Sequence, residues 1–173
     1  MAPSHVVLAG SIGSVTHGKG LPVKAEDKIR EGAGPFLQEG EEILAAFVAR
    51  PRGWTQQNAG VRGLGTSQAA KATAGAEAAG FNLASPMALA ITQRRLLSFA
   101  LGATPGMGMG GQIKELAGEA PLEAVDSIEV KRLLMGKVVK VTIRGSEFKL
   151  EAGAGANAKG VAEAFEQRQA AAV

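Results

Sequence analysis

Few residues in this chain could carry out catalysis. Cysteine is absent, which excludes disulfides, thiolate metal sites and cysteine nucleophiles. The two histidines, His5 and His17, both lie in an N-terminal stretch without sustained periodicity, so a zinc site or a catalytic triad would have to form there. Carboxylates such as Glu77, Glu119 and Asp126 could act as acid or base, but nothing in the sequence pairs them. We therefore predict a non-enzymatic protein without a cofactor or a metal.

Two glycine-rich stretches could be mistaken for phosphate-binding loops. They are Gly10-x-x-Gly13 and GMGMGG at 106–111. A phosphate loop follows a strand, precedes a helix and usually carries a lysine. The second stretch lies in a hairpin-like connection, and Lys114 follows it on an expected strand. Neither stretch therefore predicts nucleotide binding.

The chain carries charged residues of both signs and has a small net charge. It has 19 basic and 16 acidic residues, a net charge of +3, and only 4% aromatic residues. A nucleic-acid-binding protein usually carries a basic stripe and stacking aromatic side chains, so we predict no nucleic-acid partner. No apolar run approaches the roughly 20 residues of a membrane span, and no basic region precedes the short apolar run from His5 to Val15. With the lack of cysteine, these features favour a cytoplasmic protein.

Side chains that could contact a partner are cations near loops and soft or small apolar groups. The candidates are Arg50, Arg52, Trp54, Ala70, Ala74, Arg94, Arg95, Met107 and Met109. Methionines adapt to irregular surfaces, and turn cations can meet an acidic partner or anionic lipid. The alternatives are solvated arginines, a disordered methionine loop, and a tryptophan that pins an insert to the domain. We expect a protein partner or self-association, or alternatively a weak contact with an anionic membrane surface.

Alternating apolar residues predict seven strands and a last helix. The strands are expected at Glu41–Arg50, in two strands of a hairpin within Ser85–Leu101, and at Gln112–Glu119, Ala124–Leu133, Lys137–Arg144 and Glu147–Glu151. Turns are expected at Met135-Gly136 and Gly145-Ser146. The helix is expected at Asn157–Ala170, with Asn157 as its N-cap and Phe165 on its apolar stripe.

The segment Gly53–Asn82 is an insert between the first two strands, and almost all its residues are small. It is either a mobile surface loop or a helix that starts at Thr66 or Ser67 and packs closely through small residues. In the second case, Ala70, Ala74, Gly75 and Ala78 would form the face that another backbone approaches.

The chain divides into three expected regions. Residues 1–22 form a disordered tail, or the native start is Val23, because Gly18-Lys19-Gly20 can be encoded by a purine-rich ribosome-binding sequence. Residues 23–38 are a helical segment, and residues 39–171 form the domain.

The strand order resembles that of bacterial pleckstrin-homology-like, or GRAM-like, domains. LAITQRRLLSF (89–99) is similar to a pair of strands in these domains, expected here as the second and third, and PLEAVDSIEVKR (121–132) to a later strand, expected here as the fifth. GKVVKVTIRGSEFKLEA (136–152) is similar to the hairpin that follows that strand. The alanine and glycine content is similar to that of actinobacterial proteins. The resemblance implies a seven-strand antiparallel barrel capped by the C-terminal helix. It also implies a binding module: relatives bind phosphoinositides through clustered cations near the first hairpin, whereas here the corresponding cations, Arg50, Arg52, Arg62 and Lys71, are spread over the insert.

Overall fold

The computed structural model describes residues 25–53, 64–102 and 111–171. Outside these residues lie the expectations for the tail at 1–22, the start at Val23, Trp54, Met107 and Met109.

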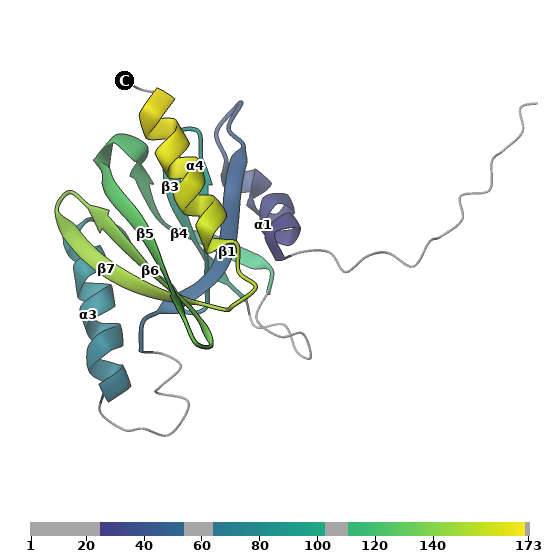
Figure 1. The fold of residues 1–173 in the computed structure, drawn as a ribbon. Coiled ribbons are helices and arrows are strands. Elements are labelled where there is room, and N and C mark those ends of the chain that lie inside the picture. Colours follow the sequence, from purple (N-terminus) through teal and green to yellow (C-terminus); the bar gives the residue numbers. More distant parts are fainter. Residues whose placement is uncertain (1–24, 54–63, 103–110, 172–173) are drawn as a thin grey trace, which may run out of the picture.

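Among the described residues, seven strands form one antiparallel sheet (Figure 1). In chain order they are β1 (Ile43–Pro51), β2 (Met87–Thr92), β3 (Arg95–Leu101), β4 (Ile113–Pro121), β5 (Val125–Leu133), β6 (Gly136–Ile143) and β7 (Ser146–Ala152). The order across the sheet is β4-β3-β2-β1-β7-β6-β5. The predicted seven-strand antiparallel sheet with a C-terminal helix is confirmed. The first strand, however, begins at Ile43 rather than Glu41 and extends to Pro51.

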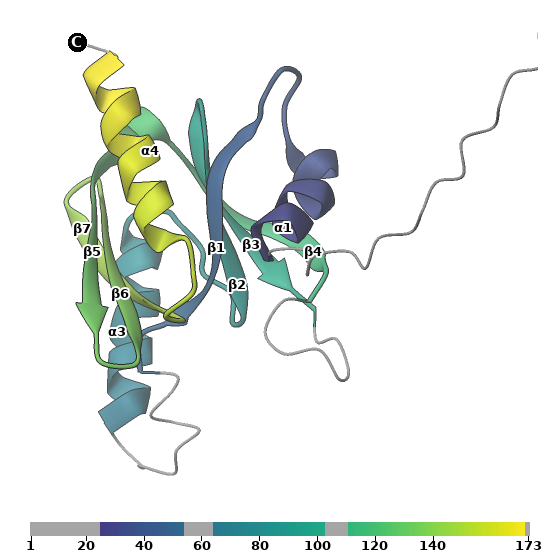
Figure 2. The same ribbon diagram turned by 45° about the vertical axis from the view of Figure 1, so that its right-hand side comes forward.

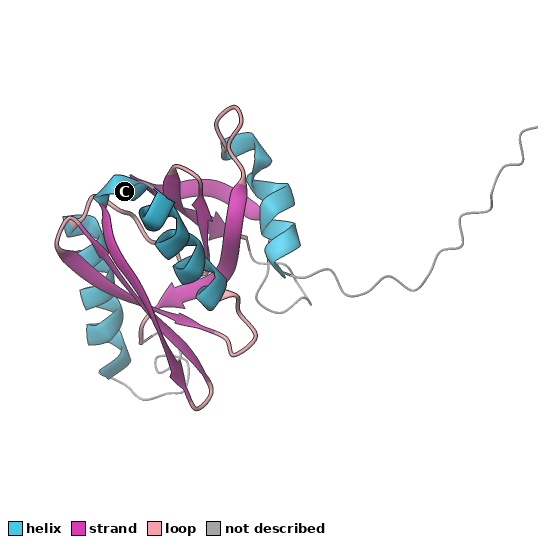
Figure 3. Cartoon of the chain, turned by 45° about the horizontal axis from the view of Figure 1, so that its top comes forward, coloured by secondary structure: helices cyan, strands magenta, loops and turns pink. Residues whose placement is uncertain are grey.

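The sheet is bent, and helix α4 (Ala158–Ala171) lies across its open side (Figure 3). No ladder joins the edge strands β4 and β5 within the described residues, and α4 contacts β1, β2 and β5. The predicted barrel is therefore closed by a packed helix rather than by backbone hydrogen bonds between β4 and β5. The side chain of Asn157 accepts a hydrogen bond from the backbone N–H of Gly160 at 3.2 Å, which is the predicted N-cap.

The main core lies between the bent sheet and α4. Phe165 and Val161 of α4 are buried in the same cluster as Val141 and Ile143 of β6, as the alternation of these residues predicts. Phe47, Met87, Leu89 and Leu150 from β1, β2 and β7 complete its centre. The apolar stripe of α4 thus fills the opening that the sheet leaves.

A second core covers the opposite face of β1 to β4. Helix α1 (Ala25–Ala33) and the 3-10 turn η1 (Gly34–Phe36) pack there, with Ile29 and Ala33 buried (Figure 2). The rings of Phe36 and Phe99 lie 5.9 Å apart. Because β2 is buried on both faces, its sequence reads as a continuous apolar run. Ala25, the first residue of α1, is exposed.

The insert between β1 and β2 contains a packed helix, α3 (Leu64–Ala78). This helix already includes Thr66 and Ser67, so neither residue is its N-cap. Its buried residues are Ala72 and Ala76, followed by Ala79 just beyond its end. Of the predicted small face, Ala70, Ala74 and Ala78 are exposed and do not pack on the sheet, so the approach of a partner or a second copy to them stays a prediction.

Gly75 is the fourth member of that predicted face, and it does allow close approach. A Cβ atom at Gly75 would lie 2.3 Å from the backbone carbonyl oxygen of Glu147 on β7, which is too short for any real contact. Six residues further on, beyond the end of α3, the ring of Phe81 stacks on Phe148 of β7 with centroids 5.6 Å apart. The backbone of α3 therefore rests directly on β7, where a larger residue could not fit.

Both hairpin turns of the second half of the sheet lie one residue earlier than predicted. They are Leu134-Met135 and Arg144-Gly145. Arg144 and Gly145 have φ angles of 49° and 77°. A two-residue hairpin turn of type I′ requires positive φ at both central residues, so the glycine occupies the second of them.

Replacing Phe165 with Ala should destabilise the fold by about 3–5 kcal/mol, because the ring is 3% exposed and fills the opening of the sheet. Urea unfolding of Phe165→Ala and of the exposed control Gln167→Ala measures this difference. A loss below about 1 kcal/mol at Phe165 would mean that α4 does not close the sheet.

Gly75→Ala should also destabilise the protein, by about 1–3 kcal/mol, although alanine is the better helix former by about 1 kcal/mol. The reason is the contact between the new Cβ and the carbonyl of Glu147. The neighbouring exposed change Ala74→Leu should leave the unfolding free energy within about 0.5 kcal/mol. Thermal stability of Gly75→Ala equal to or above that of the wild type would show that α3 does not dock on β7 this closely.

Candidate functional site

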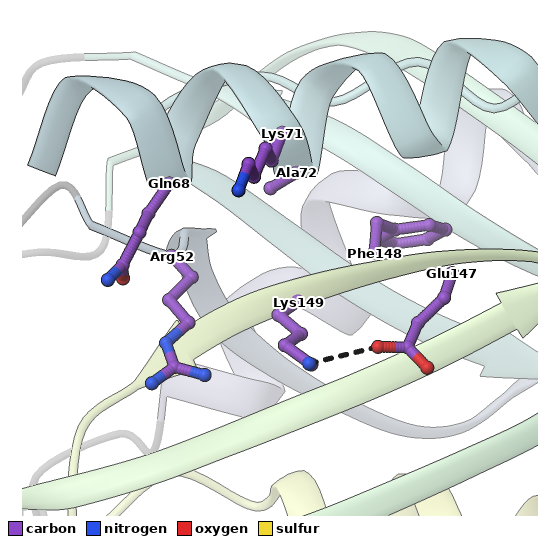
Figure 4. A pocket seen from close by; sticks show the side chains of 7 residues that line it. All are labelled: Arg52, Gln68, Lys71, Ala72, Glu147, Phe148 and Lys149. Carbon is purple, nitrogen blue, oxygen red and sulfur yellow. Dashed lines mark ion pairs between the residues drawn. The ribbon is translucent and has the colours of Figure 1, made fainter. Parts of the chain in front are cut away.

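A cleft lies between α3 and the start of β7 (Figure 4). We call it the α3–β7 cleft, and its volume is about 400 Å³. Its lining residues are Arg52, Gln68, Lys71, Ala72, Glu147, Phe148 and Lys149. Ala72 and Phe148, which are almost fully buried, form its apolar base, and the other side chains are polar or charged. Residues of both the insert and the sheet thus line the cleft.

Backbone contacts hold the parts of the cleft in place. The backbone N–H of Arg52 donates to the carbonyl of Lys149 at 3.0 Å, which extends the β1–β7 pairing by one residue. The N–H of Gly53 donates to the carboxylate of Glu151 at 2.9 Å. On the other wall, the close approach of Gly75 to Glu147 fixes α3 against β7. Figure 4 shows Gln68 projecting from α3 toward Arg52.

The cleft carries three cations and one carboxylate. Glu147 is shared between Lys149, at 3.0 Å, and Lys140, at 3.7 Å. The hydrogen bond from Lys149 is the main reason that the pKa of Glu147 lies below its usual value. Within the described residues, this carboxylate pairs with neither Arg52 nor Lys71. The cleft is therefore net positive, with two cations available to an acidic group.

The structure places the predicted contact residues at separate locations. Arg52 lines the cleft, whereas Arg50 is half-buried on β1 opposite Glu151 of β7. Burial lowers the pKa of Arg50, and the nearby carboxylate of Glu151 opposes that shift. Arg94 is exposed at the β2–β3 turn and is not among the residues that line the cleft. Ala70 and Ala74 lie on the solvent side of α3.

Arg95 occupies an internal ion pair rather than an exposed turn. Its guanidinium donates to the carboxylate of Glu41 at 2.5 and 3.0 Å, and it also pairs with Glu119. The side chain of Glu41 is fully buried, and it accepts a further hydrogen bond from the Thr92 hydroxyl at 2.7 Å. The backbone N–H of Gln38 donates to the same carboxylate. This network ties the segment after η1 to β2, β3 and β4.

A second, larger cavity of about 780 Å³ lies between the start of α1, β1 and the β7–α4 loop. Its polar lining groups bond to one another or to the backbone: Asn157 donates to Glu26 at 2.9 Å, and Lys137 donates to the carbonyl of Ala156 at 2.5 Å. Because these groups are satisfied, the α3–β7 cleft is the better candidate for ligand binding.

One exposed surface escaped the sequence reasoning. Leu133, Leu134 and Met135 are 52%, 103% and 92% exposed at the end of the β5–β6 hairpin. We call these three residues the hairpin tip. The signal was present in KRLLMGK (131–137), three apolar residues between cations. The expected turn, Met135-Gly136, lies one residue later than the observed one and left Leu134 outside both the strand and the turn.

The part of the chain that the structure describes holds no group of three or more metal-ligating acidic, histidine or cysteine side chains. In the same residues, none of the helices combines the length and the apolar character that crossing a bilayer requires.

Comparisons with known proteins found solved structures that are similar to this chain. No family model and no curated protein matches the chain. A DUF1696 family protein with a pleckstrin-homology domain from Shewanella loihica PV-4 aligns over 82% of this chain and 93% of its own, with 14% identity and a TM-score of 0.41. A pleckstrin homology domain from Shewanella amazonensis SB2B aligns over 82% of this chain and 95% of its own, with 14% identity and a TM-score of 0.43.

The Glu41–Arg95 pair predicts how stability depends on pH. The hydrogen bond from Arg95 is the main cause that lowers the pKa of Glu41 to about 2, from 4.5 in the unfolded chain. The ionised carboxylate therefore contributes its full stabilisation above about pH 4.5, on the order of 3 kcal/mol, and loses it as the pH falls toward 2.

Urea unfolding of the wild type and of Glu41→Gln across this pH range tests the prediction. The wild type should be more stable at neutral pH, and the difference should shrink steadily below pH 4.5. The control is Glu42→Gln, which changes an exposed neighbour. A wild-type advantage that stays constant down to pH 2 would contradict the assignment.

Proposed function

We propose that this domain is a non-catalytic binding module that holds an acidic, partly apolar segment of a protein partner in the α3–β7 cleft. The observation that carries the proposal is the pairing of two available cations, Arg52 and Lys71, with an apolar floor. Charged groups around a cleft set orientation and specificity, and apolar surface supplies contact area. A segment with carboxylates spaced between apolar side chains matches both parts.

The environments of the carboxylates support a non-catalytic role. Glu119 pairs with Arg95, and Asp126 accepts a hydrogen bond from the backbone N–H of Gly145 at 2.7 Å. Glu77 is exposed on α3. Acid–base catalysis by a pair of carboxylates needs two of them near one another and near a substrate site, and these three belong to separate parts of the fold.

The size of the cleft fits a short segment rather than a large surface. About 400 Å³ lies at the lower end of the range for ligand sites and accommodates a few side chains. Such a site gives modest affinity, because few groups are buried and partly exposed ion pairs contribute little each. This is the behaviour expected of a reversible adaptor.

Fluorescence anisotropy with a labelled peptide of alternating glutamate and leucine tests the proposal. Arg52→Gln/Lys71→Gln should weaken binding about tenfold, since each charge contributes up to about 1 kcal/mol. Arg94→Gln removes a comparable exposed charge elsewhere and should have less than about a twofold effect. A second peptide with glutamine in place of glutamate should bind the wild type weakly.

Two results would count against the cleft. One is equal weakening by Arg94→Gln and by the double variant, which would indicate a diffuse effect of net charge. The other is equal binding of the glutamate and glutamine peptides. Amide chemical shifts give an independent readout, because peptide binding at the cleft should perturb Gln68 and Lys149.

A further inference from the structure

The hairpin tip is an apolar surface that the fold itself does not use. Leu134 and Met135 are as exposed as they would be in an extended chain, and Leu133 is half-exposed beside them. The β5–β6 hairpin reaches beyond the neighbouring strands at the bottom of Figure 1 and again in Figure 3. Isolated exposed leucines are common on proteins, but three consecutive apolar residues at one convex point form a patch.

The formation of the β5–β6 hairpin does not require apolar residues at its turn. Two-residue hairpin turns favour glycine, asparagine and aspartate, because these residues accept the required backbone angles or bond to the backbone. Leu133 pairs with Gly136 at the last position of the β5–β6 ladder, so the turn itself is tight. Polar turn residues would close the same ladder and keep the surface soluble.

The charged residues next to the tip along the chain are all positive. The sequence from Lys131 to Ser146 contains no carboxylate. Lys131 and Arg132 are exposed directly behind the tip, and neither forms an ion pair with another described residue. Lys137 follows the turn, where its ammonium group donates to the carbonyl of Ala156 at 2.5 Å. The nearest carboxylate on β5, Glu129, is paired with Lys140.

We propose that the hairpin tip inserts into the interface of an anionic lipid bilayer, with Lys131 and Arg132 at the level of the headgroups. Apolar side chains that enter the interface, ringed by cations, bind reversibly through apolar burial and electrostatic attraction. The convex shape suits a flat, deformable surface. Two copies of the chain would bring like charges together, so self-association through the tip is disfavoured.

The structure limits the depth of insertion. Gly136 and Val138 are already buried in the domain, and Lys137 is held against the β7–α4 loop. Only the three tip residues can therefore leave water. This site is separate from the α3–β7 cleft and does not depend on the function proposed for it.

Co-sedimentation with phosphatidylcholine vesicles, with and without phosphatidylserine, tests the proposal. Leu134→Ser/Met135→Ser keeps the charges and should reduce partition onto the anionic vesicles at least about tenfold. Lys131→Gln/Arg132→Gln keeps the apolar tip and should reduce it roughly tenfold at low salt and less at high salt. Arg52→Gln/Lys71→Gln is the matched control, which removes two cations at the cleft and should change partition less than about twofold.

Insertion has its own readout. In a Trp54→Phe background, Leu134→Trp should show blue-shifted emission and quenching by brominated lipid on anionic vesicles. Lys159→Trp, at an exposed position of α4, should show neither. Leu134→Ser/Met135→Ser and Lys131→Gln/Arg132→Gln should melt within about 2 °C of the wild type, because these four side chains are exposed.

Three outcomes would overturn the proposal. The first is that the wild type does not bind the anionic vesicles. The second is that the tip variant binds as well as the wild type or that the tryptophan at 134 stays in water. The third is light scattering that finds a wild-type dimer which Leu134→Ser/Met135→Ser converts to a monomer, because a second copy would then cover the tip.

Discussion

The close approach of α3 to β7 at Gly75 is the constraint on which the candidate binding site depends. A glycine there lets the helix backbone reach the carbonyl of Glu147, and Ala72, Ala76 and Ala79 bury beside it. Small side chains bury little apolar area each, so the stability of this contact comes from its closeness rather than from large residues. If α3 were lifted from β7, Lys71 and Gln68 would leave the cleft and only its β7 wall would remain.

The sheet and the last helix could be predicted from the sequence because their signals are local. Val139, Val141 and Ile143 alternate along β6, and Val161 and Phe165 share one stripe of α4. The packing of α3 has no such signal. Alanines lie on every side of it, so the pattern does not distinguish Ala72 and Ala76, which are buried, from Ala70 and Ala74, which are exposed. Only the position of β7 decides which face packs.

The sites were harder to predict because they depend on residues that are distant in sequence or on single-residue shifts. Arg95 reads as a turn cation, yet it is held by Glu41, 54 positions earlier, and by Glu119 on β4. The hairpin tip was missed because the turn was expected at Met135-Gly136, whereas Leu134 and Met135 form it. Arg52 was identified correctly as a candidate, but its neighbours in the cleft come from two other elements. The two proposals assign an acidic partner to the cleft and a membrane to the tip, which are different surfaces of the domain.

The central claim is that α3 is a docked wall of the cleft and not a mobile insert. Hydrogen exchange of the backbone amides of residues 70–79, followed at neutral pH, tests it most directly. Docking predicts that these amides exchange slowly, with protection approaching that of β6 and β7, and that Gly75→Ala lowers the protection of α3 before that of the sheet. Exchange of residues 70–79 at the rate of an unstructured peptide, while β6 and β7 stay protected, would contradict the account.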